Sequence, residues 1–310
     1  MDFNLSINSI TKTFNNNKII ANDNISTQFI PGKITALTGH NGAGKTTLLN
    51  QIMGIVRPNK GSITFAGHSF TQEPALARRM ISMMPQLHAP LAGVSLRQSI
   101  EAIARIRGSY GNVLKEEVAE VIDSLKINDW ADISGEKLSG GLQRLTSFAM
   151  TVVAPSPILL FDEPTNDVDP VRRKLIWQYL RKLAQQNYIV IVVTHNLLEV
   201  DQYADRYLLL DHGQLVKDES TDILTNDLLS SAILTISTKR KFKKEEFPQA
   251  NTIVTSEDFQ YELFLGADEI ANAITWLYGR MGRNEIRHYS LTPASVSYTH
   301  LRAHETAANL

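Results

Sequence analysis

Residues 35–49 read TALTGHNGAGKTTLL, and the part from Gly39 to Thr46 fits the pattern G-x-x-x-x-G-K-[ST]. A loop this rich in glycine lets its backbone N–H groups turn inward around phosphate oxygens. An apolar strand is predicted over 33–37, and a helix that starts at about Lys45 points its positive end at the same anion. We therefore expect a phosphate-binding loop, in which Lys45 reaches the β- and γ-phosphates and Thr46 holds Mg²⁺. The alternative is a plain glycine-rich turn, and the strand–loop–helix order speaks against it.

The composition is that of a folded globular chain of one large or two ordinary domains, with 310 residues, 43% of them hydrophobic and 20% charged. The formal net charge of −1 gives no reason to expect nucleic acid as a partner. The sequence contains no cysteine, which excludes disulfides and cysteine metal sites. Its apolar runs are too short to span a bilayer and its N-terminus does not resemble a signal peptide. We expect a soluble chain whose membrane contact is peripheral.

A second group of polar residues follows predicted buried strands. Ile158 to Phe161 form an apolar run that ends in Asp162 and Glu163. The carboxyl ends of parallel strands meet at one edge of a sheet, where ligands bind. Asp162 suits the oxygen shell of Mg²⁺, and Glu163 suits a base that orients an attacking water. A solvated Asp-Glu pair is the alternative, and it loses force because a phosphate loop stands in the same chain.

Two further strands end in a polar residue in the same way. The predicted strand over 81–84 stops at Pro85-Gln86, and the strand over 189–193 runs into Thr194-His195. Taken alone, Gln86 would be a surface residue and His195 a structural one. Their shared place at a strand end makes both candidates for the same site.

Residues 87–155 are predicted to be mainly helical and to interrupt the strand pattern, as a subdomain inserted into an α/β core. Ser95 and Gln98 have the spacing of a capping box. The block contains Leu138-Ser139-Gly140-Gly141-Leu142-Gln143-Arg144, followed by an apolar helical stripe. Ser139 and the two glycines give a second helix N-terminus that can meet a phosphate. By itself this motif would be an ordinary helix cap.

The ends of the chain carry weaker signals. Strands are predicted over 5–14 and 25–30, and Phe14 can either pack in the core, which periodicity favours, or stack on an adenine. Residues 221–295 are predicted to form a small α+β unit with a helix over 268–278, and the basic run Lys239–Lys244 in it is expected to be a solvated turn. Residues 296–310 look like a translated adapter from a DNA-sequencing library, so we expect a non-native tail there.

The order of these motifs resembles that of ATP-binding-cassette (ABC) ATPases over about residues 1–220. The matching segments are the phosphate loop, Gln86 as the Q-loop, 138–144 as the signature, 158–163 as the Walker B strand, Asp169 in the D-loop, and His195 as the switch histidine. The signature is the specific part, because ordinary P-loop kinases and GTPases lack it. The resemblance implies an α/β P-loop NTPase core (1–220) with an antiparallel β subdomain and an inserted helical subdomain, besides the C-terminal α+β appendage.

The resemblance also implies roles for single residues. Glu163, His195, Lys45 and Gln86 would be catalytic, and Thr46, Gln86 and Asp162 would face Mg²⁺. The residues expected to contact ATP are Phe14, Gly39, Asn41, Gly42, Ala43, Gly44, Lys45, Thr46, Thr47, Ser139, Gly140 and Gly141. Two positions depart from the family pattern: Leu142 replaces the more usual glutamine, and Asp167 replaces a small or apolar residue and could weaken dimer closure.

In this family two copies pair head to tail, so that Ser139 to Gly141 of one meet the γ-phosphate held by Lys45 of the other. We expect an ATPase subunit of an ABC transporter on the cytoplasmic face of a membrane. It would pair with itself and drive a permease on a separate chain. The appendage resembles that of drug-export branches and suggests an exporter. The alternative is a non-transport ABC ATPase that acts on ribosomes or nucleic acid. A ribosome-acting protein would usually carry two cassettes, and this chain has one; a DNA-repair relative would carry a long coiled coil or zinc cysteines between phosphate loop and signature, and neither is present.

Overall fold

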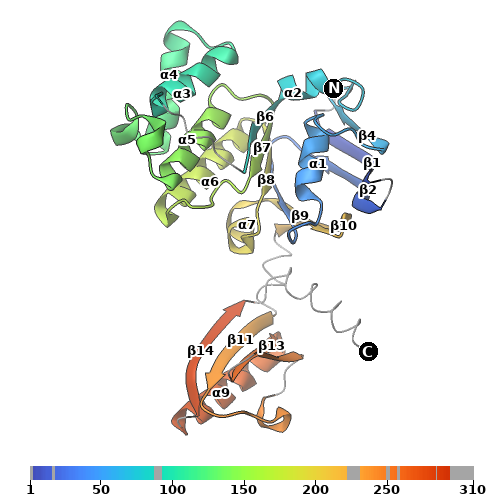
Figure 1. The fold of residues 1–310 in the computed structure, drawn as a ribbon, viewed down its shortest axis with the longest axis vertical. Coiled ribbons are helices and arrows are strands. Elements are labelled where there is room, and N and C mark those ends of the chain that lie inside the picture. Colours follow the sequence, from blue (N-terminus) through green and yellow to red (C-terminus); the bar gives the residue numbers. More distant parts are fainter. Residues whose placement is uncertain are drawn as a thin grey trace. The chain divides into compact units, whose positions relative to one another are not determined.

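The computed structural model describes residues 3–15, 18–86, 93–221, 231–248, 252–256, 259–283 and 285–293. The chain divides into two compact units, Met1–Ser220 and Thr221–Leu310. Both are drawn in Figure 1. The predicted non-native tail, 296–310, lies outside the described residues.

The main sheet of the N-terminal unit has six strands in the order β10-β9-β3-β8-β7-β6. Their bounds are β3 Ile34–Thr38, β6 Ile81–Met84, β7 Ile158–Asp162, β8 Ile189–Val193, β9 Arg206–Asp211 and β10 Gln214–Ser220. Neighbouring strands are parallel except for β9 and β10. Every residue of β3, β7 and β8 is buried, as expected of apolar parallel strands covered on both faces. The carboxyl ends of β3, β6, β7 and β8 therefore share one edge.

A second, four-stranded antiparallel sheet has the order β2-β1-β4-β5. Its strands are β1 Leu5–Phe14, β2 Ile19–Phe29, β4 Lys60–Phe65 and β5 His68–Ser69. The prediction that β2 starts at residue 25 is wrong, because Ile19 already pairs with Phe14. Ile19 and Ile20 are both exposed, so the first part of this strand lacks the inside–outside alternation that a sequence pattern can detect.

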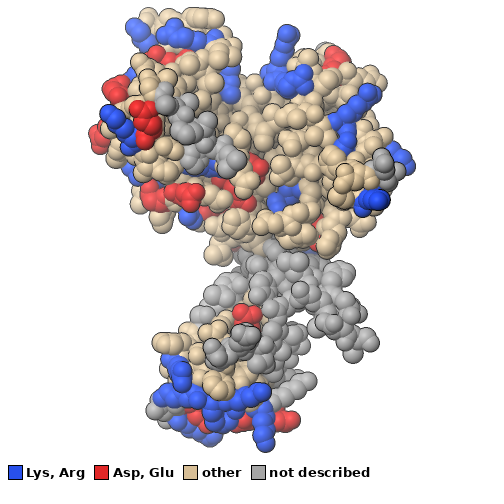
Figure 2. All heavy atoms as spheres, in the orientation of Figure 1, with Lys and Arg blue, Asp and Glu red and all other residues tan. Residues whose placement is uncertain are grey.

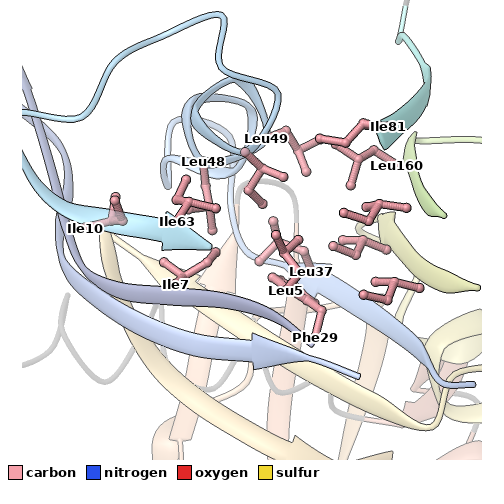
Figure 3. Packing of buried hydrophobic residues seen from close by; sticks show 14 of the residues in the cluster. Leu5, Ile7, Ile10, Phe29, Leu37, Leu48, Leu49, Ile63, Ile81 and Leu160 are labelled. Carbon is pink, nitrogen blue, oxygen red and sulfur yellow. The ribbon is translucent and has the colours of Figure 1, made fainter. Parts of the chain in front are cut away.

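Helix α1 (Lys45–Ile52) lies between the two sheets. Figure 3 shows Leu48 and Leu49 pointing into a cluster that also holds Ile63 of the antiparallel sheet and Leu37 and Leu160 of the main sheet. All five are at most 1% exposed. Because one helix is packed against both sheets, the loop that precedes it is held at the edge of the main sheet.

The inserted part contains three longer helices, α3 (Leu96–Ile106), α4 (Gly111–Ser124) and α5 (Gly140–Val152). The predicted capping box forms, with Ser95 Oγ accepting from the Gln98 N–H and Gln98 Oε1 accepting from the Ser95 N–H. Phe148 of α5 stacks on Phe161 of β7 at 5.4 Å between ring centroids. Residues 87–92 of the insert lie outside the described residues. The remaining helices of this unit are α2 (Pro74–Met80), α6 (Pro170–Gln185) and α7 (Leu197–Tyr203).

The C-terminal unit is an antiparallel sheet of order β12-β13-β11-β14 with one long helix. Its elements are β11 Ser231–Thr238, β12 Thr252–Ser256, β13 Gln260–Gly266, α9 Ala267–Gly282 and β14 Ile286–Pro293. Leu277 of α9 packs with Leu234 and Leu263 of the sheet. The predicted fold class is confirmed: an α/β core with an antiparallel subdomain, inserted helices and a small α+β appendage.

The basic run of the C-terminal unit holds local ion pairs. Figure 2 shows Lys and Arg gathered at one end of this unit. Arg240 pairs with Glu246 and Glu285, and its guanidinium lies 4.6 Å from the centroid of the Phe242 ring. These pairings agree with a solvated turn that is fixed by its neighbours. No described helix is long and apolar enough to cross a membrane.

Candidate active site

A pocket of about 230 Å³ opens at the carboxyl edge of the main sheet, beside the start of α1. It is lined by Ile19, Ile20, Ala21, Asn41, Gly42, Gly44, Lys45, Thr46, Thr47, Gln86, Asp162, Glu163 and Val193. The pocket thus brings the predicted phosphate loop, the predicted metal residues Thr46, Gln86 and Asp162, and the predicted base together. The lining residues come from five separate segments of the sequence.

Two glycines of the loop are required by close backbone contacts. A Cβ on Gly39, which has φ +141°, would lie 2.2 Å from the carbonyl oxygen of Leu210. A Cβ on Gly44, which has φ +101°, would lie 2.1 Å from the carbonyl oxygen of Ala21. Ala43 is fully buried below the loop. The loop therefore follows a path that side chains would block, and its N–H groups stay accessible to a ligand.

The ammonium of Lys45 is held inside the loop. Its Nζ donates to the carbonyl oxygens of Gly39 at 2.7 Å and His40 at 2.9 Å. Burial lowers the pKa of Lys45 below its ordinary value, and the nearby charges of Glu163 and Asp162 act in the opposite direction. The cation is thus partly desolvated and bonded only to neutral acceptors, which phosphate oxygens can replace.

The two carboxylates at the end of β7 are buried, with Asp162 4% and Glu163 7% exposed. Burial raises the pKa of Asp162, the charge of Glu163 raises it further, and Arg144 and Lys45 oppose the shift. Glu163 has φ +51° and donates its N–H to the carbonyl of Val193 at 2.9 Å. A left-handed backbone at a non-glycine residue is strained and is common at functional sites.

The predicted switch histidine contacts the predicted base directly. His195 Nδ1 lies 2.8 Å from Glu163 Oε1, while the histidine side chain is 71% exposed. The other carboxylate oxygen, Glu163 Oε2, is buried and makes no hydrogen bond among the described residues. One oxygen is therefore paired with the histidine, and the other keeps an unused acceptor lone pair.

Arg144 connects the signature helix to this edge, a role that the sequence analysis did not assign. Its Nη1 donates to the carbonyls of Pro85 and Gln86, and its Nη2 donates to those of Asp162 and Glu163. The residue is 2% exposed. Burial lowers the pKa of Arg144, and the charges of Asp162, Asp167 and Glu163 act in the opposite direction. The sequence did contain a signal for this role: an arginine stands among the apolar residues of the helix, and a buried charge needs partners.

The signature tip does not line the pocket of its own chain. Ser139 caps α5, its Oγ accepting from the Leu142 N–H at 3.4 Å, and both Ser139 and Gly140 are exposed. A Cβ on Gly141 would lie 2.8 Å from the carbonyl oxygen of Asp167, which has φ +61°. The unusual Asp167 therefore packs its backbone against the signature helix.

Phe14 lies beside the pocket without lining it. It is 40% exposed, so the core position that periodicity favoured is wrong. The reason is its place at the last residue of β1, where the Lys12 ammonium lies 4.9 Å from the ring centroid. Ile19, its partner in the hairpin, does line the pocket.

Residues 22–166 match the sequence profile of the ABC transporter family. The daunorubicin/doxorubicin resistance ATP-binding protein DrrA of Streptomyces peucetius is 29% identical over 74% of this chain and 69% of its own length. The Nod factor export ATP-binding protein I of Sinorhizobium fredii is 27% identical over 76% of this chain and 68% of its own length. The human cholesterol transporter ABCA5 is 34% identical over 68% of this chain, but over 13% of its own length.

Solved structures share the fold. The ATP-binding subunit of an ABC transporter superposes with a TM-score of 0.66 and 18% identity, over 72% of this chain and 92% of the other. The dimeric cassette MJ0796 gives a TM-score of 0.63 with 24% identity, over 70% of this chain and 98% of the other.

We predict that Arg144→Lys destabilises the N-terminal unit by about 1–3 kcal/mol, because one ammonium cannot serve carbonyls on two strand ends and leaves a buried acceptor unpaired. Urea unfolding followed by circular dichroism measures the loss. The matched control is Arg105→Lys, since Arg105 is exposed and makes one 3.7 Å ion pair with Glu101. Equal stability of the two variants would show that the buried contacts of Arg144 are unimportant.

Proposed function

The chain belongs to the ABC transporter family of ATPases, and from this premise we propose that it is the ATP-hydrolysing subunit of an exporter whose membrane-spanning permease is a separate chain. The supporting observation is the single pocket that joins the phosphate loop to Asp162 and Glu163. Export is suggested by the names of two relatives, a drug-resistance protein and a Nod factor export protein.

The residues of the pocket suit Mg²⁺ together with a nucleotide. Hard cations prefer oxygen ligands, and the pocket offers the hydroxyl of Thr46, the amide oxygen of Gln86 and the carboxylate of Asp162. The raised pKa of Asp162 means that its charge is poorly compensated by the protein alone. We propose that these three residues hold the ion. When bound, Mg²⁺ would neutralise charge on the β- and γ-phosphates.

In the proposed reaction Glu163 acts on the attacking water. The unpartnered Oε2 accepts a proton as the water oxygen bonds to the γ-phosphorus and the bond from that phosphorus to the β-γ bridging oxygen breaks, leaving ADP and phosphate. His195 orients the same carboxylate through Oε1 and, once a nucleotide is bound, would contact the γ-phosphate. Lys45 exchanges its two loop carbonyls for phosphate oxygens. Catalysis is then mainly positioning and charge stabilisation.

We further propose that the active assembly is a symmetric pair of chains. The exposed tip formed by Ser139 and Gly140 lies outside its own pocket, so a contact with the γ-phosphate requires a second copy. Gly141 and Asp167 would lie at the seam. A chain that keeps Lys45, Glu163 and His195 can complete two identical sites by pairing with itself.

The first prediction from this proposal concerns Glu163→Gln. Loss of the base should lower ATP turnover by at least about 100-fold while ATP binding persists, because the phosphate loop is unchanged. Phosphate release measures turnover, and sedimentation in Mg-ATP measures dimers, which should accumulate. The exposed Glu116→Gln is the matched control and should keep the native rate. Native turnover in Glu163→Gln would contradict the assignment of the base.

A mixing experiment tests the composite site. Lys45→Ala and Ser139→Arg should each be inactive as homodimers, because every site lacks either the lysine or the signature tip. A mixture should regain part of the turnover, since a heterodimer has one site with the native lysine of one chain and the native tip of the other. Each variant alone at the same total concentration is the control. A mixture that stays as inactive as its components would argue against pairing.

The permease can be sought by capture. Glu163→Gln loaded with Mg-ATP, applied to detergent-solubilised native membranes, should retain a protein with several apolar spans. The double variant Lys45→Ala/Glu163→Gln is the control, because it should not close on nucleotide. Specific retention of ribosomes, with no membrane protein, would instead favour the non-transport alternative.

A further inference from the structure

Three side chains outside the catalytic carboxylates meet where the phosphate loop packs on the turn between β9 and β10. They are His40 from the loop, Asp211 at the end of β9 and His212 from the turn. Nε2 of His40 lies 3.1 Å from Asp211 Oδ1, and Nε2 of His212 lies 3.8 Å from the same oxygen. One potential ligand atom from each residue falls within 4.8 Å of the other two.

The ring of His40 is set in one tautomer by its backbone contact. Its Nδ1 lies 2.7 Å from the carbonyl oxygen of Asn41, which can only accept, so Nδ1 must carry a hydrogen. In the neutral ring Nε2 then has a free lone pair. That atom is buried and makes no hydrogen bond, although it faces a carboxylate. Two acceptors this close require a proton or a metal cation between them.

The same arrangement is usual for a histidine that binds a metal, which donates its other N–H to a carbonyl and points its lone pair at the ion. The surrounding backbone keeps the two segments in place. Gly39 packs against the carbonyl of Leu210, and the Gly213 N–H donates to the Ala43 carbonyl at 3.1 Å. Two of the three donors therefore lie in a fixed frame, while the His212 side chain, 81% exposed, can turn toward them.

We propose that His40, Asp211 and His212 bind one divalent transition-metal ion, with Zn²⁺ as the best match to two imidazoles and a carboxylate. Zinc–ligand bonds of about 2.0–2.2 Å in a tetrahedral site place donors about 3.3 Å apart. The distances of 3.1 and 3.8 Å to Asp211 are close to this value, and a turn of the exposed His212 ring can bring its donor, which lies within 4.8 Å of the other two, to the same spacing. A fourth position would remain for solvent. Mg²⁺ prefers oxygen donors, so this site is chemically distinct from the one at Asp162.

A metal ion at this site would also act on the phosphate loop. The carbonyl of His40 accepts one of the hydrogen bonds from Lys45 Nζ, at 2.9 Å. An ion on the side chain of the same residue would tether the phosphate loop to the β9–β10 turn. Any change that the ion causes in nucleotide affinity must be matched by an equal change that the nucleotide causes in metal affinity.

The test is a calorimetric Zn²⁺ titration of the untagged, nucleotide-free full chain. Three of the six other histidines are replaced first, so the background carries His195→Ala, His300→Ala and His304→Ala. We expect one equivalent of Zn²⁺ in this background. The addition of His212→Ala should weaken binding by about 100-fold or more, because the loss of a ligand costs more than the loss of an outer partner. His212 is exposed, so this change does not threaten folding.

The matched control is His68→Ala, a histidine whose side chain is 58% exposed and lies 3.7 Å from Glu73. It should leave the titration unchanged. With Co²⁺ in place of Zn²⁺, the visible absorption of a low-coordinate site should appear in the background and vanish with His212→Ala. Identical affinity with and without His212, or no binding up to about 100 µM Zn²⁺, would overturn the proposal and leave a simple His40–Asp211 ion pair. These outcomes do not depend on ATP hydrolysis.

Discussion

A buried guanidinium joins the inserted helices to the edge of the main sheet that lines the pocket. Arg144 donates to the carbonyls at the ends of β6 and β7, the two strands that carry Gln86 and the pair of carboxylates. A charge that is 2% exposed is costly to leave unpaired, so a rotation of α5 that broke these bonds would cost several kcal/mol. Helix α5 and the ends of β6 and β7 are therefore expected to move together.

This coupling matters for the proposed pairing, because Ser139 caps the same helix that carries Arg144. A partner's phosphate that displaced the tip of α5 would transmit its force through the guanidinium to the Asp162 and Glu163 backbone. Nucleotide binding at one site of a symmetric pair would then be coupled to the other site through helix α5. The packing of Gly141 on Asp167 gives a second route between the same segments.

The sequence predicted the elements whose signals are local. The phosphate loop has its own pattern of glycines, β7 and β8 are continuous apolar runs, and the capping box joins Ser95 to Gln98 only three residues later. What failed or went unseen depends on contacts that a local sequence pattern does not report. Phe14 could not be placed because its neighbours across the hairpin decide its exposure, and the first part of β2 lacks alternation. The carbonyl partners of Arg144 lie 18 to 59 residues away in sequence, and no periodicity reports such a contact.

A second polar cluster lies next to the proposed base in sequence. Glu199 Oε2 accepts from the Thr165 hydroxyl at 2.8 Å and from the Trp177 indole at 2.9 Å, and its Oε1 accepts from Asn196 Nδ2 at 3.0 Å. Thr165 lies two residues after Glu163, and Asn196 directly follows His195, the histidine that contacts Glu163. One buried carboxylate thus fixes the two segments that present the base and its orienting ring. Glu163 itself has a left-handed backbone conformation that is strained for a non-glycine residue, and such a conformation persists only where the surrounding structure supports it.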